Sequence, residues 1–436
     1  MERLPVQFIE NMKKQLPESE WEAFFAVYEK KPFKGVRLNP LKGGRYELKG
    51  KLPFIGEPIP WEENGFYTAE EKVGSSPFHA AGLFYSQEPS AMSAAPLLDV
   101  KKGERVLDLC SAPGGKGTQL ACKMDGEGII VLNEPVFSRA KILSQNVERM
   151  GIKNAVVTSE LPEKLSEKFL GYFDKILIDA PCSGEGMFRK NAEEALSEWS
   201  EENVALCSKR QAYILEEGTK MLKQGGRLVY STCTFSEEED EGQVRDYLQK
   251  HPEMRLISME KLYPHKVAGE GHFVALFEKD GESQRGYIKE KKSSVTRQAE
   301  EGYRAFEKNF LTMKMSRLFE AGECLYALPE GVFDFSGLQV LRVGVRLGEW
   351  INGRFEPSHS LAMSLKKEEC KNVLDISETD NRIEKYLRGE TLEIGENENV
   401  KNGWCLVCID GYPLGLGKAV NGTLKNHYPK GLRKRS

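Results

Sequence analysis

Two cysteines lie where a thiolate could attack a substrate. Cys182 belongs to the segment Asp179-Ala180-Pro181-Cys182-Ser183-Gly184-Glu185-Gly186, and Cys233 belongs to Ser231-Thr232-Cys233-Thr234. Each segment follows a short apolar run of the kind that forms a buried strand. A thiolate is a strong nucleophile, and a second group nearby can assist release of a covalently bound product. Buried free cysteines are more often small apolar core residues, but two of them at the ends of adjacent strands favour a chemical role.

A second segment suits a nucleoside cofactor. The apolar run 106–110 leads into Ser111-Ala112-Pro113-Gly114-Gly115-Lys116, and we expect a helix from about Thr118. Glycines let the backbone approach a ligand where a Cβ atom would clash. A helix start offers free amide groups and the positive end of a dipole. The spacing is not that of a nicotinamide or phosphate-binding loop, so the segment suits the carboxylate and ribose of a nucleoside.

Acidic residues follow the next three expected strands. Glu134 comes after the second strand, where an acidic residue can accept both ribose hydroxyls of an adenosine. Glu160, after the third strand, is placed to bind the adenine amino group, and Asp179 ends the fourth. One acidic residue after a strand is usually a helix cap. Several of them behind a glycine turn predict a fold that binds S-adenosylmethionine.

These motifs require strands that end at one edge of a sheet. Between about residues 84 and 279, apolar runs alternate with helical stretches such as 136–150 and 201–222. This alternation predicts an open, mostly parallel sheet with helices on both faces and a ligand beyond the carboxyl ends of the strands. The expected strands are Val106–Cys110, Gly128–Asn133, Ala155–Thr158, Lys175–Asp179, Arg227–Ser231 and Phe273–Phe277.

The rest of the chain divides into flanking parts. Residues 1–80 have helical and then turn-rich patterns, which predict an α+β extension. Residues 81–280 form the expected catalytic domain, and the polar stretch 281–301 is typical of a linker. Residues 302–436 have short strands, at 340–347 and 405–409, and many glycines, which predict a small α+β or β-barrel domain.

Composition limits the classes of protein. The chain has 436 residues, enough for two or three domains, and no apolar run long enough to cross a bilayer. The N-terminus lacks a signal-peptide pattern, so we expect a cytoplasmic protein. Nine cysteines are too few for a disulfide scaffold. Cys405 and Cys408 form a lone Cys-x-x-Cys in an expected buried strand, so we expect no metal site.

Net charge argues weakly against a nucleic-acid protein, but its distribution does not. The net charge is −4, whereas residues 417–436 contain no acidic residue. Such a cluster can meet phosphates, or it can be a solvated tail. Its basic residues are Lys418, Lys425, Lys430, Arg433, Lys434 and Arg435.

The chain resembles the Sun/Nop-type RNA cytosine-5 methyltransferases, and within them the bacterial small-subunit rRNA methyltransferase F group. The resemblance implies a Rossmann-like, S-adenosylmethionine-dependent methyltransferase domain, an N-terminal extension (residues 1–80) that binds RNA, and a C-terminal PUA-like domain that binds structured RNA. It covers the catalytic domain and extends to the end of the chain. The segments that carry it are 85–92, 110–116, 179–186, 231–234, 264–265, 269–273, 403–404, 410–415 and 425–431.

The resemblance also implies a role for each site residue. Cys233 is the nucleophile, and Cys182 helps to eliminate the product. Lys116 and Asp179 contact the reacting base, while Arg189 and Lys190 lie near RNA phosphate unless they form a solvated face. The residues that hold S-adenosylmethionine are Cys110, Ser111, Ala112, Pro113, Gly114, Gly115, Lys116, Glu134, Glu160 and Asp179.

The implied reaction is methylation of carbon 5 of cytosine in ribosomal RNA, the 16S rRNA of the small subunit. Carbon 5 is a poor nucleophile, but a thiolate that adds to carbon 6 turns the ring into an enamine that can attack a sulfonium methyl group. The proton on carbon 5 and the thiol then leave. The expected partner is rRNA or the small subunit, with the cytosine unpaired or flipped, and the protein is expected to act as a monomer.

Three alternatives remain open from sequence. Cys182 could be the nucleophile, because a Pro-Cys dipeptide supplies it in DNA cytosine methyltransferases. The substrate could be a tRNA, because tRNA and rRNA enzymes share the catalytic domain. The chain could also be a catalytically silent RNA-binding assembly factor, although the loop and both cysteines are intact.

Overall fold

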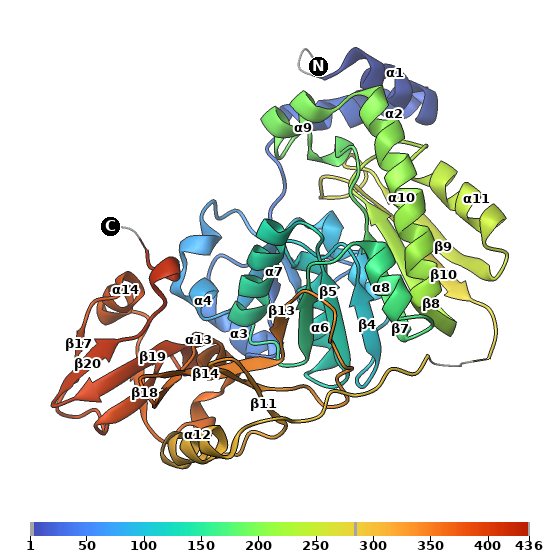
Figure 1. The fold of residues 1–436 in the computed structure, drawn as a ribbon. Coiled ribbons are helices and arrows are strands. Elements are labelled where there is room, and N and C mark those ends of the chain that lie inside the picture. The colour runs from blue at the N-terminus through green and yellow to red at the C-terminus, as the bar shows by residue number, and fades with distance from the viewer. Residues whose placement is uncertain (1–3, 283–285, 435–436) are drawn as a thin grey trace.

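The computed structural model describes residues 4–282 and 286–434, and an eight-stranded sheet lies at its centre (Figure 1). The strand order is β13-β6-β5-β4-β7-β8-β10-β9. Strands β4 to β8 pair in parallel, whereas β10 is antiparallel to both of its neighbours and β13 is antiparallel to β6. This confirms the predicted open, mostly parallel sheet. The strands are β4 (Arg105–Asp108), β5 (Ile129–Asn133), β6 (Ala155–Thr158), β7 (Phe173–Asp179), β8 (Leu222–Thr232), β9 (Met254–Leu262), β10 (His272–Lys279) and β13 (Val340–Val343).

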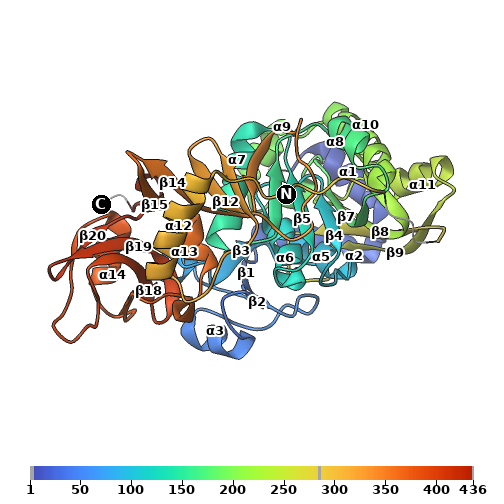
Figure 2. The same ribbon diagram turned by 60° about the horizontal axis from the view of Figure 1, so that its bottom comes forward.

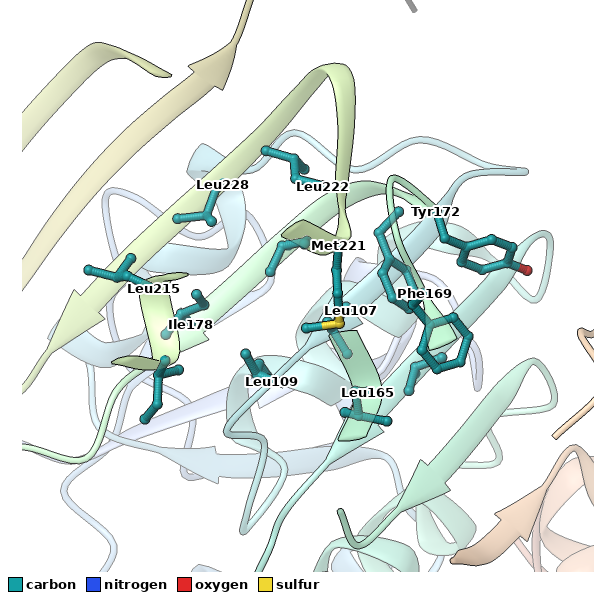
Figure 3. Packing of buried hydrophobic residues seen from close by; sticks show 14 of the residues in the cluster. Leu107, Leu109, Leu165, Phe169, Tyr172, Ile178, Leu215, Met221, Leu222 and Leu228 are labelled. Carbon is teal, nitrogen blue, oxygen red and sulfur yellow. The ribbon is translucent and has the colours of Figure 1, made fainter. Parts of the chain in front are cut away.

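Helices cover both faces of this sheet. One face carries α5 (Ala94–Leu97), α6 (Gly115–Met124) and α7 (Phe137–Arg149), and the other carries α8 (Pro162–Lys168), α10 (Glu201–Met221) and α11 (Glu241–Lys250). Alternate strand residues point to the two faces. Val106 packs in the first core, under α5, α6 and α7, and Leu107 packs in the second core, under α8, α10 and α11. Figure 3 shows the second core, where Leu165 and Met221 approach the strands. Each fully buried side chain of this size contributes about 1.5–3 kcal/mol, so the two cores fix the position of the strand ends.

The observed elements differ from the predicted ones in several places. Strand β8 begins at Leu222, earlier than the expected Arg227. The helix expected from about Thr118 begins earlier, at Gly115. The single strand expected at 340–347 is two strands in different sheets, β13 and β14 (Val345–Ile351), because the chain turns at Gly344, whose φ is +53°. Strand β9 was not predicted.

The N-terminal extension packs against loops of the catalytic domain. Its three-stranded sheet has the order β2-β1-β3. Helices α1 and α2 pack with Phe188, Trp199 and Phe235 in one cluster, and in Figure 1 they lie beside α9. The elements are α1 (Val6–Gln15), α2 (Glu18–Ala26), η1 (Val27–Glu29), β1 (Gly35–Leu38), α3 (Arg45–Lys51), β2 (Gly65–Tyr67), η2 (Val73–Ser75), α4 (Pro77–Ala80), β3 (Phe84–Gln87) and η3 (Ser90–Met92), with η4 (Glu185–Met187) and α9 (Ala192–Glu198) in the loop they cover.

The C-terminal region contains two further sheets, with the orders β11-β12-β14-β15 and β16-β18-β19-β20-β17 (Figure 2). Cys405 and Cys408 are buried in β18, as the strand prediction required. The remaining elements are α12 (Arg297–Phe310), β11 (Leu318–Ala321), β12 (Cys324–Ala327), β15 (Arg354–Pro357), α13 (His359–Ser364), η5 (Lys367–Glu369), β16 (Val373–Ile376), α14 (Arg382–Arg388), β17 (Leu392–Glu393), β18 (Gly403–Ile409), β19 (Tyr412–Val420), β20 (Thr423–Asn426) and η6 (Lys430–Leu432).

The basic C-terminal segment folds back onto the protein. Arg433 donates to the carbonyl of Tyr428, and Lys434 donates to the carbonyl of Ser75 in the N-terminal extension. Arg435, part of the predicted basic cluster, lies outside the described residues. Within the described ranges, no helix is both long enough and apolar enough to span a bilayer. The predicted domain limits stay predictions, although β13 shows that a strand beyond residue 302 completes the catalytic sheet.

Candidate active site

The two cysteines predicted to carry the chemistry lie side by side. Cys182 follows β7 and Cys233 follows β8, two parallel neighbours in which Asp179 is opposite Ser231. The two Sγ atoms are 3.1 Å apart, and the Cys233 N–H donates to Cys182 Sγ at 3.3 Å. Both side chains are partly exposed. The structure therefore brings both thiols to one accessible place at the carboxyl ends of the strands.

The Cys182 thiol keeps its proton. Its hydrogen bond with Cys233 and its burial raise the pKa of Cys182 well above the usual value for a cysteine. Either sulfur can be the donor in the contact between the two thiols. A protonated Cys182 next to Cys233 can serve as a proton donor, and the division of labour between the two cysteines stays a prediction.

A buried carboxyl group frames the loop that carries Cys182. Glu239 Oε2 accepts from the Ser183 N–H at 3.0 Å and from Gln211 Nε2 at 2.8 Å, and the same amide nitrogen donates to the Pro181 carbonyl at 3.0 Å. Burial raises the pKa of Glu239 to about 7. Sequence reasoning missed both residues. The signal for Glu239 was the acidic run 237–241 directly after the Cys233 motif.

Asp179 lies beside the cysteines in an ion pair with Lys116. Lys116 Nζ is 2.8 Å from Asp179 Oδ2, and Ser231 Oγ donates to Asp179 Oδ1 at 2.8 Å. Loss of solvent is the largest single effect and raises the pKa of Asp179, but the charges of Lys116 and His272 and the hydrogen bonds from Lys116 and Ser231 together lower that pKa below its usual value. The Asp179 side chain is 33% exposed, so its carboxylate is ionised and accessible.

The predicted cofactor loop joins β4 to α6. The Ser111 N–H donates to the Asn133 carbonyl at 2.8 Å, and Asn146 Nδ2 donates to the Pro113 carbonyl at 2.8 Å. Gly114 has a φ of +112°, a region that disfavours side chains. A Cβ atom on Gly117 would lie 2.5 Å from Ser111 Oγ, so this position has no room for one. The loop is therefore tightly packed against its neighbours.

Glu134 and Glu160 follow β5 and β6, as predicted. Glu134 Oε1 accepts from the Val136 N–H at 3.0 Å, and Oε2 is 3.4 Å from Arg139 Nη1. Glu160 is half-buried, and its Oε1 accepts from the Gln339 N–H at 2.5 Å. The two carboxylates therefore stand at successive strand ends, where the sequence predicted contacts to ribose and adenine.

The residues present fit a nucleoside cofactor. Asp108, at the end of β4, is buried, which raises its pKa to about 7. Its Oδ2 accepts from Ser111 Oγ at 2.8 Å, but its buried Oδ1 has no hydrogen-bond partner in the described part of the chain. An orphaned buried oxygen next to the loop indicates a polar group or water that the protein itself does not supply.

Arg37 of the N-terminal extension contacts the start of α6, next to the cofactor loop. The sequence did not predict this contact. Its side chain is 2% exposed, and Nη2 donates to the Gly115 carbonyl at 3.0 Å and to Thr118 Oγ1 at 2.8 Å. Nε donates to Gln87 Oε1 at 3.1 Å. The available signal was an arginine inside the short apolar strand β1. The extension thus contributes directly to the start of α6.

The expected contact of Arg189 with RNA phosphate needs correction, because its guanidinium is not at the surface. Arg189 forms an ion pair with Glu270 at 2.6 Å, and the two side chains are only 5% and 1% exposed. It also donates to the carbonyls of Val27 and Gly269. Arg189 therefore joins the N-terminal extension to two catalytic loops. Lys190 is exposed, and its predicted phosphate contact stays a prediction.

Replacing Arg189 with alanine should destabilise the protein by about 3–5 kcal/mol, because it leaves the Glu270 carboxylate buried and unpaired. The free energy of unfolding from chemical denaturation measures this loss. Arg297→Ala is the matched control, since Arg297 pairs with Glu301 but is 91% exposed, and such pairs contribute little. Equal stability of the two variants would contradict the structural role of Arg189.

Relatives with curated names align over nearly the whole chain. A protein of Shewanella oneidensis named "Ribosomal RNA small subunit methyltransferase F" is 31% identical over 470 residues, covering 100% of this chain and 98% of its own. One of the same name from Vibrio vulnificus is 32% identical, with 98% and 97% covered. A solved methyltransferase homologue from Pyrococcus horikoshii has 27% identity and a TM-score of 0.56, covering 63% of this chain and 100% of that one.

Family descriptions match four consecutive parts of the chain. Residues 95–282 match the family "16S rRNA methyltransferase RsmB/F", and residues 4–89 match the family "N-terminal domain of 16S rRNA methyltransferase RsmF". Residues 305–365 match the "RsmF rRNA methyltransferase first C-terminal domain", and residues 371–434 match the "Methyltransferase RsmF PUA domain". These matches confirm the predicted fold class, with a PUA-like C-terminal domain, and the predicted RNA methyltransferase class with S-adenosylmethionine as cofactor. With relatives at 31% identity aligned along its whole length, the chain belongs to the RsmB/F family of 16S rRNA methyltransferases.

Proposed function

We propose that the protein methylates carbon 5 of cytosine in small-subunit rRNA through a covalent bond between Cys233 and the base. The observation that carries the proposal is the pair of sulfur atoms 3.1 Å apart, next to the Lys116–Asp179 ion pair at the cofactor end of the sheet. The names of the full-length relatives support rRNA of the small subunit as the substrate.

Cys233 begins the reaction. Its thiolate attacks carbon 6, a C–S bond forms, and the electrons of the carbon 5–carbon 6 double bond make carbon 5 nucleophilic. S-adenosylmethionine supplies an electrophilic methyl group for carbon 5. Asp179, held by Lys116 and Ser231, accepts hydrogen bonds from the amino edge of the base. A general base, water at the accessible side of the site, then takes the proton from carbon 5; the electrons of that C–H bond re-form the double bond, and the C–S bond breaks with its electrons on Cys233 Sγ, where the Cys182 thiol can donate a hydrogen bond to the departing sulfur.

The residues at the strand ends would hold the cofactor. Residues 110–116 and the start of α6 would bind its amino-acid part and ribose, Glu134 would accept from the ribose hydroxyls, and Glu160 would accept from the adenine amino group. We further propose that the protein acts in the cytoplasm as a monomer. The N-terminal extension and the PUA-like domain are proposed to bind RNA, with Lys190 near phosphate.

The test uses purified protein and labelled S-adenosylmethionine in two parallel reactions, one with small ribosomal subunits and one with tRNA, both from a strain that lacks the gene. We expect label in 16S rRNA and a bisulfite-resistant cytosine that is absent from the untreated subunits. Label in tRNA but not in rRNA would assign the enzyme to tRNA. Failure to label any RNA, with both cysteines intact, would favour the silent assembly factor.

A further inference from the structure

A strand from the C-terminal region lies at the edge of the cofactor site. Strand β13 pairs with β6, with Val340 opposite Thr158 and Val343 opposite Val156. It therefore extends the catalytic sheet at the strand whose end carries Glu160. The two strands are far apart in the sequence: Gln339, just before β13, and Glu160, just after β6, form a hydrogen bond and are 179 residues apart.

Two backbone contacts just before β13 hold the end of β6. The Ser159 N–H donates to the Gln339 carbonyl at 3.0 Å, and the Gln339 N–H donates to Glu160 Oε1 at 2.5 Å. Asn133 holds the backbone of Glu160. Asn133 Oδ1 accepts from the Glu160 N–H at 3.1 Å, and Asn133 Nδ2 donates to the Glu160 carbonyl at 2.9 Å. Glu160 is thus held through both its backbone and one carboxylate oxygen. In the described part of the chain, the other oxygen, Oε2, accepts no hydrogen bond.

The segment is itself anchored to the catalytic domain, so it can position Glu160. Arg342 donates to Ser144 Oγ at 3.1 Å and to Glu148, both on α7, and to Ser360 Oγ on α13 at 2.8 Å. Leu341 packs against the core of the first face, and Val340 packs against that of the second. This is the packing expected of a permanent part of the sheet.

Large apolar side chains that follow the ends of β5 and β6 stay exposed. Leu161, the residue after Glu160, is 57% exposed, and Val136, which caps α7 after Glu134, is 48% exposed. Exposed apolar side chains of this size at strand ends that also carry carboxylates suit a flat ring with an amino group.

We propose that the C-terminal region is part of the cofactor site: the Gln339 N–H holds Glu160 so that its Oε2 accepts from the adenine amino group. The catalytic domain therefore binds S-adenosylmethionine at full affinity only when β13 is in place. This inference rests on the proposed adenine contact of Glu160, but not on the identity of the RNA substrate.

The test compares two substitutions at one position. Gln339→Pro removes the N–H and keeps the carbonyl that accepts from Ser159, whereas Gln339→Ala keeps both. Calorimetry with S-adenosylhomocysteine and the full-length protein should show about tenfold weaker binding for Gln339→Pro, as expected for a lost hydrogen bond to a charged group. Gln339→Ala should bind like the wild type. Equal affinity of the two variants would overturn the proposal.

A second substitution distinguishes loss of the Gln339–Glu160 contact from an effect of the proline elsewhere in the fold. Glu160→Ala should weaken binding by a similar factor, and adding Gln339→Pro to it should cause no further loss, because both remove the same contact. A further tenfold loss in the double variant would show that proline acts elsewhere, and the proposal would fail. Unchanged binding by Glu160→Ala would also overturn it.

If Gln339→Pro does not fold, hydrogen exchange of the wild type gives an independent answer. S-adenosylhomocysteine should slow exchange in residues 339–343 of the wild type and not in Glu160→Ala. Absence of protection in the wild type would refute the proposal. Because no RNA is present in these experiments, a failure here is distinct from a failure of the proposed rRNA methylation.

Discussion

Replacing Cys233 with alanine should abolish methyl transfer, with a fall in turnover of about 10⁴-fold or more, the scale seen when an enzyme loses its covalent nucleophile. Serine should not restore activity, because a hydroxyl is not ionised where a thiol can be. The measurement is transfer of labelled methyl groups to small-subunit RNA. Cys324→Ala is the control, since Cys324 is a partly exposed cysteine of β12, outside the catalytic domain.

The companion variant tests the division of labour between the cysteines. With Cys182 changed to alanine, Cys233 can still attack, but the thiol that lies 3.1 Å away and assists release is missing. A protein–RNA adduct should therefore accumulate and survive a denaturing gel. The double variant should form none. An adduct with Cys233→Ala and none with Cys182→Ala would instead assign the attack to Cys182.

The juxtaposition of the cysteines was predictable from local sequence. Each follows a buried apolar run, and parallel strands end at one edge of a sheet, so the spatial contact of Cys182 and Cys233 required only that β7 and β8 be neighbours. Glu134 and Glu160 were placed at their strand ends by the same argument. Their roles toward the cofactor stay predictions.

Features that depend on distant pairing could not be predicted this way. Strand β13 joins β6 across a long separation in sequence, and no local pattern encodes that partner. Strand β9 is mostly exposed, so it lacks the apolar signal of a core strand. Arg189 looked like a surface cation because its partner, Glu270, lies 81 residues away. Burial of a charge is decided by such partners, which only the fold brings together.

Lys116→Met should lower turnover by about 10²-fold at neutral pH, the effect typical of losing one electrostatic contact in an active site. It should also make activity fall as the pH is lowered. In the wild type, desolvation raises the pKa of Asp179, but Lys116, His272 and Ser231 together keep it below its usual value, and the charge of Lys116 is the largest of these lowering effects. Without that charge, desolvation is opposed only by weaker contacts, the pKa of Asp179 rises, and the carboxylate is protonated at a higher pH. A pH profile of turnover with saturating S-adenosylmethionine measures the shift.

The sign of that shift distinguishes two roles for the lysine. If Lys116 acts by keeping Asp179 ionised, activity of Lys116→Met recovers as the pH rises, because the carboxylate forms again. The activity of Asp179→Asn should then be low and independent of pH across the same range, since the asparagine amide does not titrate. If Lys116 acts only on the cytosine or the cofactor, the turnover of Lys116→Met would be lower than that of the wild type by the same factor at every pH. The 2.8 Å contact between Lys116 and Asp179 favours the first outcome, because the charge of Lys116 is the largest contribution that lowers the pKa of Asp179.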